Sequence, residues 1–243
     1  MNVKISYRLY KWGFRVIRVI FYMLFFYKII GRENVPQGAA IICPNHSSLI
    51  DPIVVSLACG IDHHIHYVAK IELFRVPVLS FVIRKLGAIS VDRNASDTST
   101  IKAMLSCLKS GKKVGIFPEG RRIRAGEVSQ MTLRTDTGRE DPESMISVRA
   151  EPEPESETPD SGAKYGAVKI AERTGVPIVP VYVPRKKTIF KRLVLTIGEP
   201  FFIEKQSEKR SNEDFTLLAE SLMSRIEALN PQLRKLTESG NKT

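Results

Sequence analysis

The chain has 243 residues, enough for one domain with a substantial hydrophobic core. Its 37 basic and 26 acidic residues give a formal net charge of +11, which favours an anionic partner: nucleic acid, an anionic membrane or phosphorylated small molecules. Its three cysteines, Cys43, Cys59 and Cys107, form no CxxC pair, so the sequence indicates thiols of a reducing compartment and argues against a disulfide framework.

An apolar stretch with basic flanks, FRVIRVIFYMLFFYKII, runs from Phe14 to Ile30. Its uncharged centre, 19–27, has nine residues, whereas a spanning helix needs roughly 20 apolar residues. Aromatic residues crowd the stretch, and no small residues mark a cleavage site. We therefore expect residues 1–31 to form a helical anchor that lies in one leaflet of a membrane. A buried first helix and a short or tilted spanning helix are the alternatives.

Beyond residue 36 the chain alternates between strand-like and helix-like stretches. Short apolar runs predict strands, and amphipathic spacing that ends in glycine predicts helices. The expected strands are 39–43, 65–69, 88–91, 113–117, 178–183 and 193–197, and the expected helices are 52–58, 71–86, 99–109, 164–174 and 215–229. This alternation is typical of an α/β domain, here residues 32–243, with a mostly parallel mixed sheet flanked by helices.

One acidic segment interrupts the alternation. Residues 125–162 contain ten acidic and three basic residues and end in EPEPESETPDSG. A segment of this composition cannot bury enough apolar surface to offset the entropy lost on ordering, so we expect a disordered insertion. The rest of the chain has 34 basic and 16 acidic residues. The folded part is therefore more basic than the whole chain.

A histidine and an aspartate follow the first expected strand. In CPNHSSLIDPIVV, residues 43–55, Asp51 lies five residues after His46. Functional residues of open α/β sheets gather where strands end. A carboxylate that accepts a hydrogen bond from one imidazole nitrogen fixes the tautomer and makes the other nitrogen a better base, able to take a proton from an alcohol. The alternative is that Asp51 only caps the helix that begins at Pro52.

Four ordered blocks carry a resemblance to a known family. They are NHSSLIDP, GAISVDR, FPEGRR and VPIVPV, with AKIELFRVPVLSFVIRKLG between the first and the third. They resemble the glycerolipid acyltransferases, whose first motif is His-x4-Asp. The resemblance covers about residues 35–205 and is closest to the bacterial enzymes that acylate 1-acylglycerol-3-phosphate.

The resemblance implies an O-acyltransferase. His46 would act as general base on the free sn-2 hydroxyl of lysophosphatidic acid, and Asp51 would orient its ring. The hydroxyl would attack the thioester of acyl-CoA or acyl-carrier protein, giving phosphatidic acid. The resemblance implies neither a metal nor a cofactor for this reaction.

The resemblance also implies an acceptor site built from the other blocks. Arg93 and Arg122 would hold the glycerol phosphate, which matches the planar fork of arginine. Lys70 would add a point charge. Glu119 and Gly120 would shape the site, with the carboxylate positioning a glycerol hydroxyl or an arginine.

Other functions fit parts of the sequence. Nucleic-acid binding would explain the charge, but no recognised reading motif accompanies it, so we expect no nucleic-acid partner. A membrane-bound thioester hydrolase, a non-catalytic module that binds anionic lipid, and an acyltransferase for another lysolipid are the alternatives. His63, His64 and His66 with Asp62 have no matching acidic or cysteine cluster elsewhere, which argues against a metal site. We expect a surface loop that leads into the strand 65–69.

The combined expectation is a peripheral or monotopic acyltransferase on the cytoplasmic face of the cell membrane. A basic surface attracts anionic lipid by about 1 kcal/mol for each well-placed lysine or arginine. It also suits the phosphates of CoA. No short motif encodes the acyl chain length or the choice between CoA and carrier protein as donor.

Overall fold

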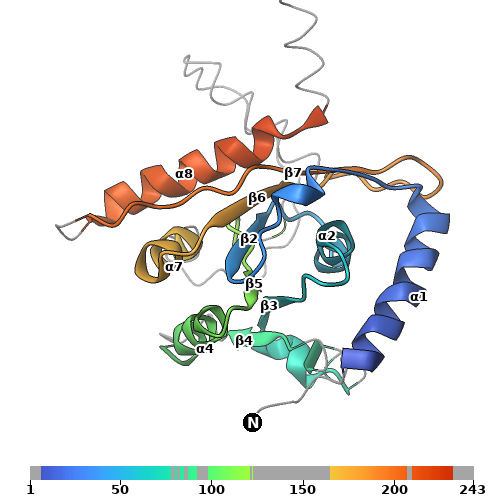
Figure 1. Cartoon of the computed structure of the whole chain (residues 1–243), viewed down its shortest axis with the longest axis horizontal. Coiled ribbons are helices and arrows are strands. Elements are labelled where there is room, and N and C mark those ends of the chain that lie inside the picture. Colours follow the sequence, from blue (N-terminus) through green and yellow to red (C-terminus); the bar gives the residue numbers. More distant parts are fainter. Residues whose placement is uncertain are drawn as a thin grey trace, which may run out of the picture.

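The computed structural model describes residues 7–77, 80, 83–84, 87–91, 98–120, 122, 165–206 and 210–231. Within these residues, seven strands form one sheet in the order β1-β7-β6-β2-β5-β3-β4 (Figure 1). Their bounds are β1 Lys28–Ile30, β2 Ala40–Pro44, β3 Ile65–Lys70, β4 Ile89–Val91, β5 Lys113–Gly115, β6 Ile178–Tyr182 and β7 Val194–Ile197. The predicted α/β class and the mostly parallel mixed sheet are confirmed.

The centre of the sheet is parallel. β6, β2, β5, β3 and β4 run in one direction, β7 pairs antiparallel with β6, and β1 pairs parallel with β7 at the edge. Successive residues of β2 belong to two different apolar clusters: Ile42 packs with one, and Ile41 and Cys43 pack with the other. A strand buried on both faces reads as a continuous apolar run, which is why β2 was visible in the sequence.

Helices cover both faces of the sheet (Figure 1). On one face lie α4 (Thr98–Lys109), α7 (Gly166–Thr174) and α8 (Asn212–Ala228), and on the other lies α2 (Asp51–Cys59). α7 ends at Gly175, whose φ of +67° permits the left-handed turn into β6. α8 begins with a capping box in which Ser211 and Asp214 bond each other's backbone N–H groups. Local signals therefore set these helix ends.

The N-terminal helix α1 (Tyr7–Phe25) lies beyond α2, at the right of Figure 1. Its inner side packs on the core through buried Phe25, with Phe21 and Leu24 beside it. Its other side exposes large apolar residues: Trp12, Val16, Val19, Ile20, Tyr22 and Met23. None of the helices that the structure describes is both long and apolar enough to cross a membrane.

The structure differs locally from the sequence prediction. The end of the expected helical anchor, residues 28–30, forms β1 beside β7. The helix expected over 71–86 begins as a 3-10 helix, η2 (Ile71–Arg75), and much of the remainder lies outside the described residues. β5 ends two residues earlier than expected, at Gly115. The acidic insertion predicted for 125–162 also lies outside the described residues.

Candidate active site

His46 and Glu119 follow neighbouring parallel strands at equivalent positions. The register places Ile42 of β2 beside Gly115 of β5. His46 comes four residues after the first, and Glu119 comes four residues after the second. Because parallel strands end at one common edge, the sheet brings the two loops together there.

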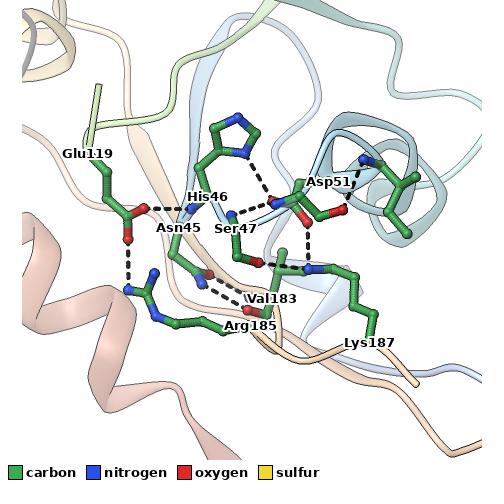
Figure 2. A network of polar contacts seen from close by, with 10 residues as sticks. Asn45, His46, Ser47, Asp51, Glu119, Val183, Arg185 and Lys187 are labelled. Carbon is green, nitrogen blue, oxygen red and sulfur yellow. Dashed lines mark hydrogen bonds and ion pairs between the residues drawn. The ribbon is translucent and has the colours of Figure 1, made fainter. Parts of the chain in front are cut away.

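The loop that carries His46 is tied to β6 by its neighbour Asn45. The fully buried Asn45 amide donates to the carbonyl oxygen of Val183 at 2.8 Å and accepts from the backbone N–H of Val183 at 2.7 Å (Figure 2). Buried polar groups that are paired in this way leave the chain little freedom. Asn45 therefore fixes the position of the His46 backbone at the end of β2.

His46 and Asp51 form a hydrogen-bonded pair. His46 Nδ1 lies 2.9 Å from Oδ2 of Asp51, and the same oxygen accepts the backbone N–H groups of Ser47 and Ser48 at 2.7 Å each (Figure 2). An ionised carboxylate only accepts, so Nδ1 carries a proton, and in the neutral ring Nε2 then presents a lone pair. No residue in the described part of the chain hydrogen-bonds Nε2. The arrangement is that of a base oriented by a carboxylate.

Phe117 holds the His46 ring from a second direction. The two rings stack with their centroids 4.0 Å apart, and the Tyr67 ring stacks beyond Phe117 at 6.0 Å. A Cβ on Gly115 would overlap the Tyr67 ring, so this glycine lets the aromatic stack approach β5. The His46 side chain keeps 17% of its surface exposed. The ring is thus fixed in orientation but not sealed from the solvent.

Asp51 is fully buried and ionised. Burial alone would raise its pKa, but the hydrogen bond from His46, the charge and hydrogen bond of Lys187 and the N–H of Ser47 hold the pKa below its usual value. Lys187 Nζ lies 2.7 Å from Oδ1 of Asp51. Asp51 is the first residue of α2, Ile50 takes the cap position, and no side chain caps the helix. The capping interpretation of Asp51 is therefore wrong, because its side chain turns back to the loop before the helix.

Glu119 connects the two loops. Its Oε2 accepts the backbone N–H of His46 at 3.0 Å, and its Oε1 lies 2.7 Å from the Arg185 guanidinium (Figure 2). Arg185 also pairs with Glu227 of α8 at 2.6 Å. Burial raises the pKa of Glu119 above its usual value, and the donors from Arg185 and His46 offset this only in part. Both oxygens of Glu119 are engaged by the protein.

The other expected acceptor residues are less constrained. Gly120 ends the block in a turn: its φ is +68°, and its N–H donates to the Phe117 carbonyl at 3.1 Å. Lys70 is exposed at the end of β3, and Arg122 is exposed beyond Gly120. Within the described part of the chain, neither cation forms an ion pair. Arg93 lies outside the described residues, two positions after the end of β4.

The sequence reasoning missed Arg185 and Lys187. Both belong to PRKK, residues 184–187, which begins two residues after the end of β6. The available signal was position, since basic residues at the carboxyl end of a parallel strand lie at the same edge as His46. Their partners are far away in the sequence, and the sequence pattern does not reveal them.

The second group of histidines packs against α1. The His64 ring lies edge-on to the rings of both Tyr10 and His66, with centroids 4.6 Å away in each case. His66 is buried, and its Nδ1 lies 2.8 Å from the Gly87 carbonyl oxygen. His66 is part of β3, as expected for the strand 65–69. The described residues contain no cluster of three or more histidine, cysteine or carboxylate side chains that could hold a metal ion.

Comparisons with known proteins agree with these features. The Acyltransferase family model matches residues 27–184. A Bacillus subtilis protein named 1-acyl-sn-glycerol-3-phosphate acyltransferase is 30% identical over 94% of this chain and 100% of its own length. A Borreliella burgdorferi protein of the same name is 24% identical over 83% of this chain and 72% of its own.

A crystal structure shows a similar fold. The 1-acyl-sn-glycerophosphate acyltransferase of Thermotoga maritima superimposes with a TM-score of 0.55 at 21% identity, over 94% of this chain and 84% of that one. The family model spans the strand β2, the His46 loop, the Glu119 loop and the end of β6. The chain therefore belongs to the acyltransferase family.

Proposed function

We propose that this enzyme transfers a fatty acyl group from acyl-CoA or acyl-carrier protein to the free sn-2 hydroxyl of 1-acylglycerol-3-phosphate. The observation that carries the proposal is the His46–Asp51 pair, with Nδ1 of the ring 2.9 Å from the carboxylate and Nε2 free of any described partner. The names of the relatives from Bacillus subtilis and Borreliella burgdorferi support this acceptor. The product is phosphatidic acid.

The geometry supports a role of His46 as general base. Nε2 takes the proton of the acceptor hydroxyl as its oxygen attacks the thioester carbonyl, and Asp51 stabilises the imidazolium that forms. The tetrahedral intermediate then expels the thiolate of CoA or carrier protein, which takes the proton back from His46. No serine nucleophile is needed, since the substrate alcohol attacks by itself.

The acceptor phosphate is assigned to cations at the same edge of the sheet. Lys70 and Arg122 are exposed there, and Arg93 follows the neighbouring strand end in the sequence. An arginine fork binds phosphate bidentately, and a lysine adds a point charge. Glu119 has both oxygens on protein donors, so we assign it to holding Arg185 and the His46 loop rather than a glycerol hydroxyl.

The enzyme is proposed to sit on the cytoplasmic face of the cell membrane through α1. The exposed apolar side of α1 is continued by Phe26 and by Ile189 and Phe190 of the β6–β7 connection, whose Phe190 N–H donates to the Leu24 carbonyl at 2.6 Å. Phe26 and Phe190 both have positive φ, an unfavourable backbone conformation for a bulky residue. Exposed basic residues flank this surface: Lys28, Lys191 and Arg192. Apolar residues bordered by cations fit an anionic bilayer surface.

A thiol-release assay tests the reaction. Purified enzyme in detergent is given acyl-CoA or acyl-carrier protein, each with and without 1-acylglycerol-3-phosphate, and the free thiol and phosphatidic acid are both measured. We expect thiol release that depends on the acceptor and equals the phosphatidic acid formed. Thiol release without acceptor would instead identify a thioester hydrolase, and no release with either donor would leave only lipid binding.

A further inference from the structure

A buried lysine lies behind the His46–Asp51 pair. The Lys187 side chain is only 5% exposed, and its Nζ lies 2.7 Å from Oδ1 of Asp51 and 2.9 Å from Oγ of Ser47 (Figure 2). Lysine is almost never fully buried unless it is paired. Since the Asp51 side chain has no exposed surface, this cation compensates a carboxylate that water does not reach.

The two oxygens of Asp51 face different partners. Oδ2 accepts from His46 Nδ1 and from two backbone N–H groups, whereas Oδ1 faces Lys187. Rotation of the carboxylate would break contacts at both oxygens, so the ion pair to Oδ1 keeps Oδ2 on His46. Removing the ammonium group would leave the Asp51 carboxylate with one positive partner fewer, so the carboxylate would attract a proton onto the imidazole more strongly.

We propose that Lys187 is a positioning residue for the acyl transfer, holding the Asp51 carboxylate on His46 and limiting how strongly that carboxylate draws a proton onto the ring. The inference rests on the function proposed above. A general base must be neutral before it reacts. Lys187 offsets part of the Asp51 charge, and Asp51 still stabilises the imidazolium once the hydroxyl proton has moved.

Two other charged side chains close to His46, Glu119 and Arg185, pair with each other. Glu119 lies on the opposite side of His46, where it pairs with Arg185, and Arg185 pairs in turn with α8. The titratable groups that surround the pair in the described structure are Glu119, Arg185, Glu227, Tyr67 and Lys187. Of the two cations among them, Lys187 is the one that contacts Asp51.

The test compares Lys187→Met, Lys187→Arg and Lys186→Met across a pH series of kcat/KM with acyl-CoA and 1-acylglycerol-3-phosphate. Lys186 is exposed and adjacent, so its methionine variant matches the charge loss. We expect Lys187→Met to lower kcat about tenfold and to move the acidic limb of the profile up by about one pH unit. KM values should change little. Lys187→Arg should retain the limb, and Lys186→Met should match the wild type.

A double-mutant cycle covers the case in which Lys187→Met folds poorly. The double variant Asp51→Asn with Lys187→Met leaves no buried charge unpaired. If Lys187 acts through Asp51, adding Lys187→Met to Asp51→Asn should cost far less activity than Lys187→Met costs in the wild type. An unmoved acidic limb in Lys187→Met, or additive losses of activity in the cycle, would overturn the proposal. Lys187 would then only hold the loop structure in place. Different results would contradict the function proposed above: turnover by the His46→Ala enzyme, or thiol release by the wild type that does not depend on the acceptor.

Discussion

The His46 loop and the outer side of α1 differ in how far their side chains are buried and hydrogen-bonded. In the loop, Asn45 and Asp51 are fully buried and bonded, and His46 is held from two directions. On α1 and the adjoining connection, large apolar side chains such as Trp12 and Phe190 are 64% and 71% exposed. Groups that must keep one geometry for chemistry are buried and paired. Groups that meet a fluid surface need only be apolar and accessible. Substitutions in one region should therefore leave the function of the other intact.

The largest effect should come from His46→Ala. Removing a general base costs roughly 10²–10⁴-fold in kcat, while binding to anionic lipid vesicles should not change. Turnover is measured by acceptor-dependent thiol release and attachment by vesicle sedimentation. The far-ultraviolet circular dichroism of the variant should match that of the wild type. Near-normal turnover would falsify the general-base mechanism.

Asp51→Asn should reduce turnover by about 10²-fold or more, because the amide stabilises the wrong imidazole tautomer. It should also change the pH dependence of stability. The pKa of Asp51 is lowered in the fold from its usual 3.8, so its contribution to stability is present above that pH and is lost as the pH falls through the lower folded value. Urea unfolding of both proteins at pH 6 and pH 3 measures this. The stability advantage of the wild type should shrink at pH 3, and a constant difference would contradict the lowered pKa.

Arg122→Ala should separate the acceptor from the donor. Loss of a charged hydrogen-bonding partner for phosphate costs about 1.5 kcal/mol, so we expect the Michaelis constant for 1-acylglycerol-3-phosphate to rise about tenfold. The constant for acyl-CoA should change far less. Arg173→Ala is a matched control from the last turn of α7. Equal increases for both substrates would show that Arg122 serves the donor or the fold.

Phe190→Ser tests the membrane side of the comparison. Partial burial of a phenylalanine in the bilayer is worth about 1 kcal/mol, so vesicle affinity should fall about fivefold while detergent-assayed turnover is kept. Phe202→Ser is the matched control, because Phe202 is 64% exposed and follows Phe201, which pairs with Ile178 at the opposite end of β6. Equal losses of vesicle affinity in both variants would show that the β6–β7 connection does not contact the bilayer. Substitution is cleaner than deletion of residues 1–31, since Lys28–Ile30 are part of the sheet.

The smallest effect should come from the acidic insertion. Residues 125–162 carry a net charge of −7 and begin beside Arg121, Arg122 and Arg124, so a disordered polyanion there would compete weakly with anionic substrates. Replacing 127–160 with a Gly/Ser linker should keep kcat and lower the acceptor KM by about twofold at low salt, with the difference vanishing at high salt. A folded variant without turnover would show that the insertion takes part in the reaction.

Local patterns were sufficient where burial is uniform. β2 and β6 are buried on both faces and read as apolar runs, and α7 carries its own stop signal at Gly175. β1 was missed because KII after an apolar helix has no strand signal of its own. It becomes a strand only by pairing with β7, whose partner residues Val194–Thr196 lie far along the chain.

The sequence by itself determined the fold class, the order of the blocks and the candidate pair His46 and Asp51, since these depend on periodicity and on residues five positions apart. Only the tertiary structure decided that Asp51 turns away from its helix, that Glu119 is held by Arg185, and that Lys187 is the buried partner of Asp51. These contacts join loops that follow different strands. A buried charge selects its partner by distance in space, and that distance exists only once the parallel strands have aligned their ends.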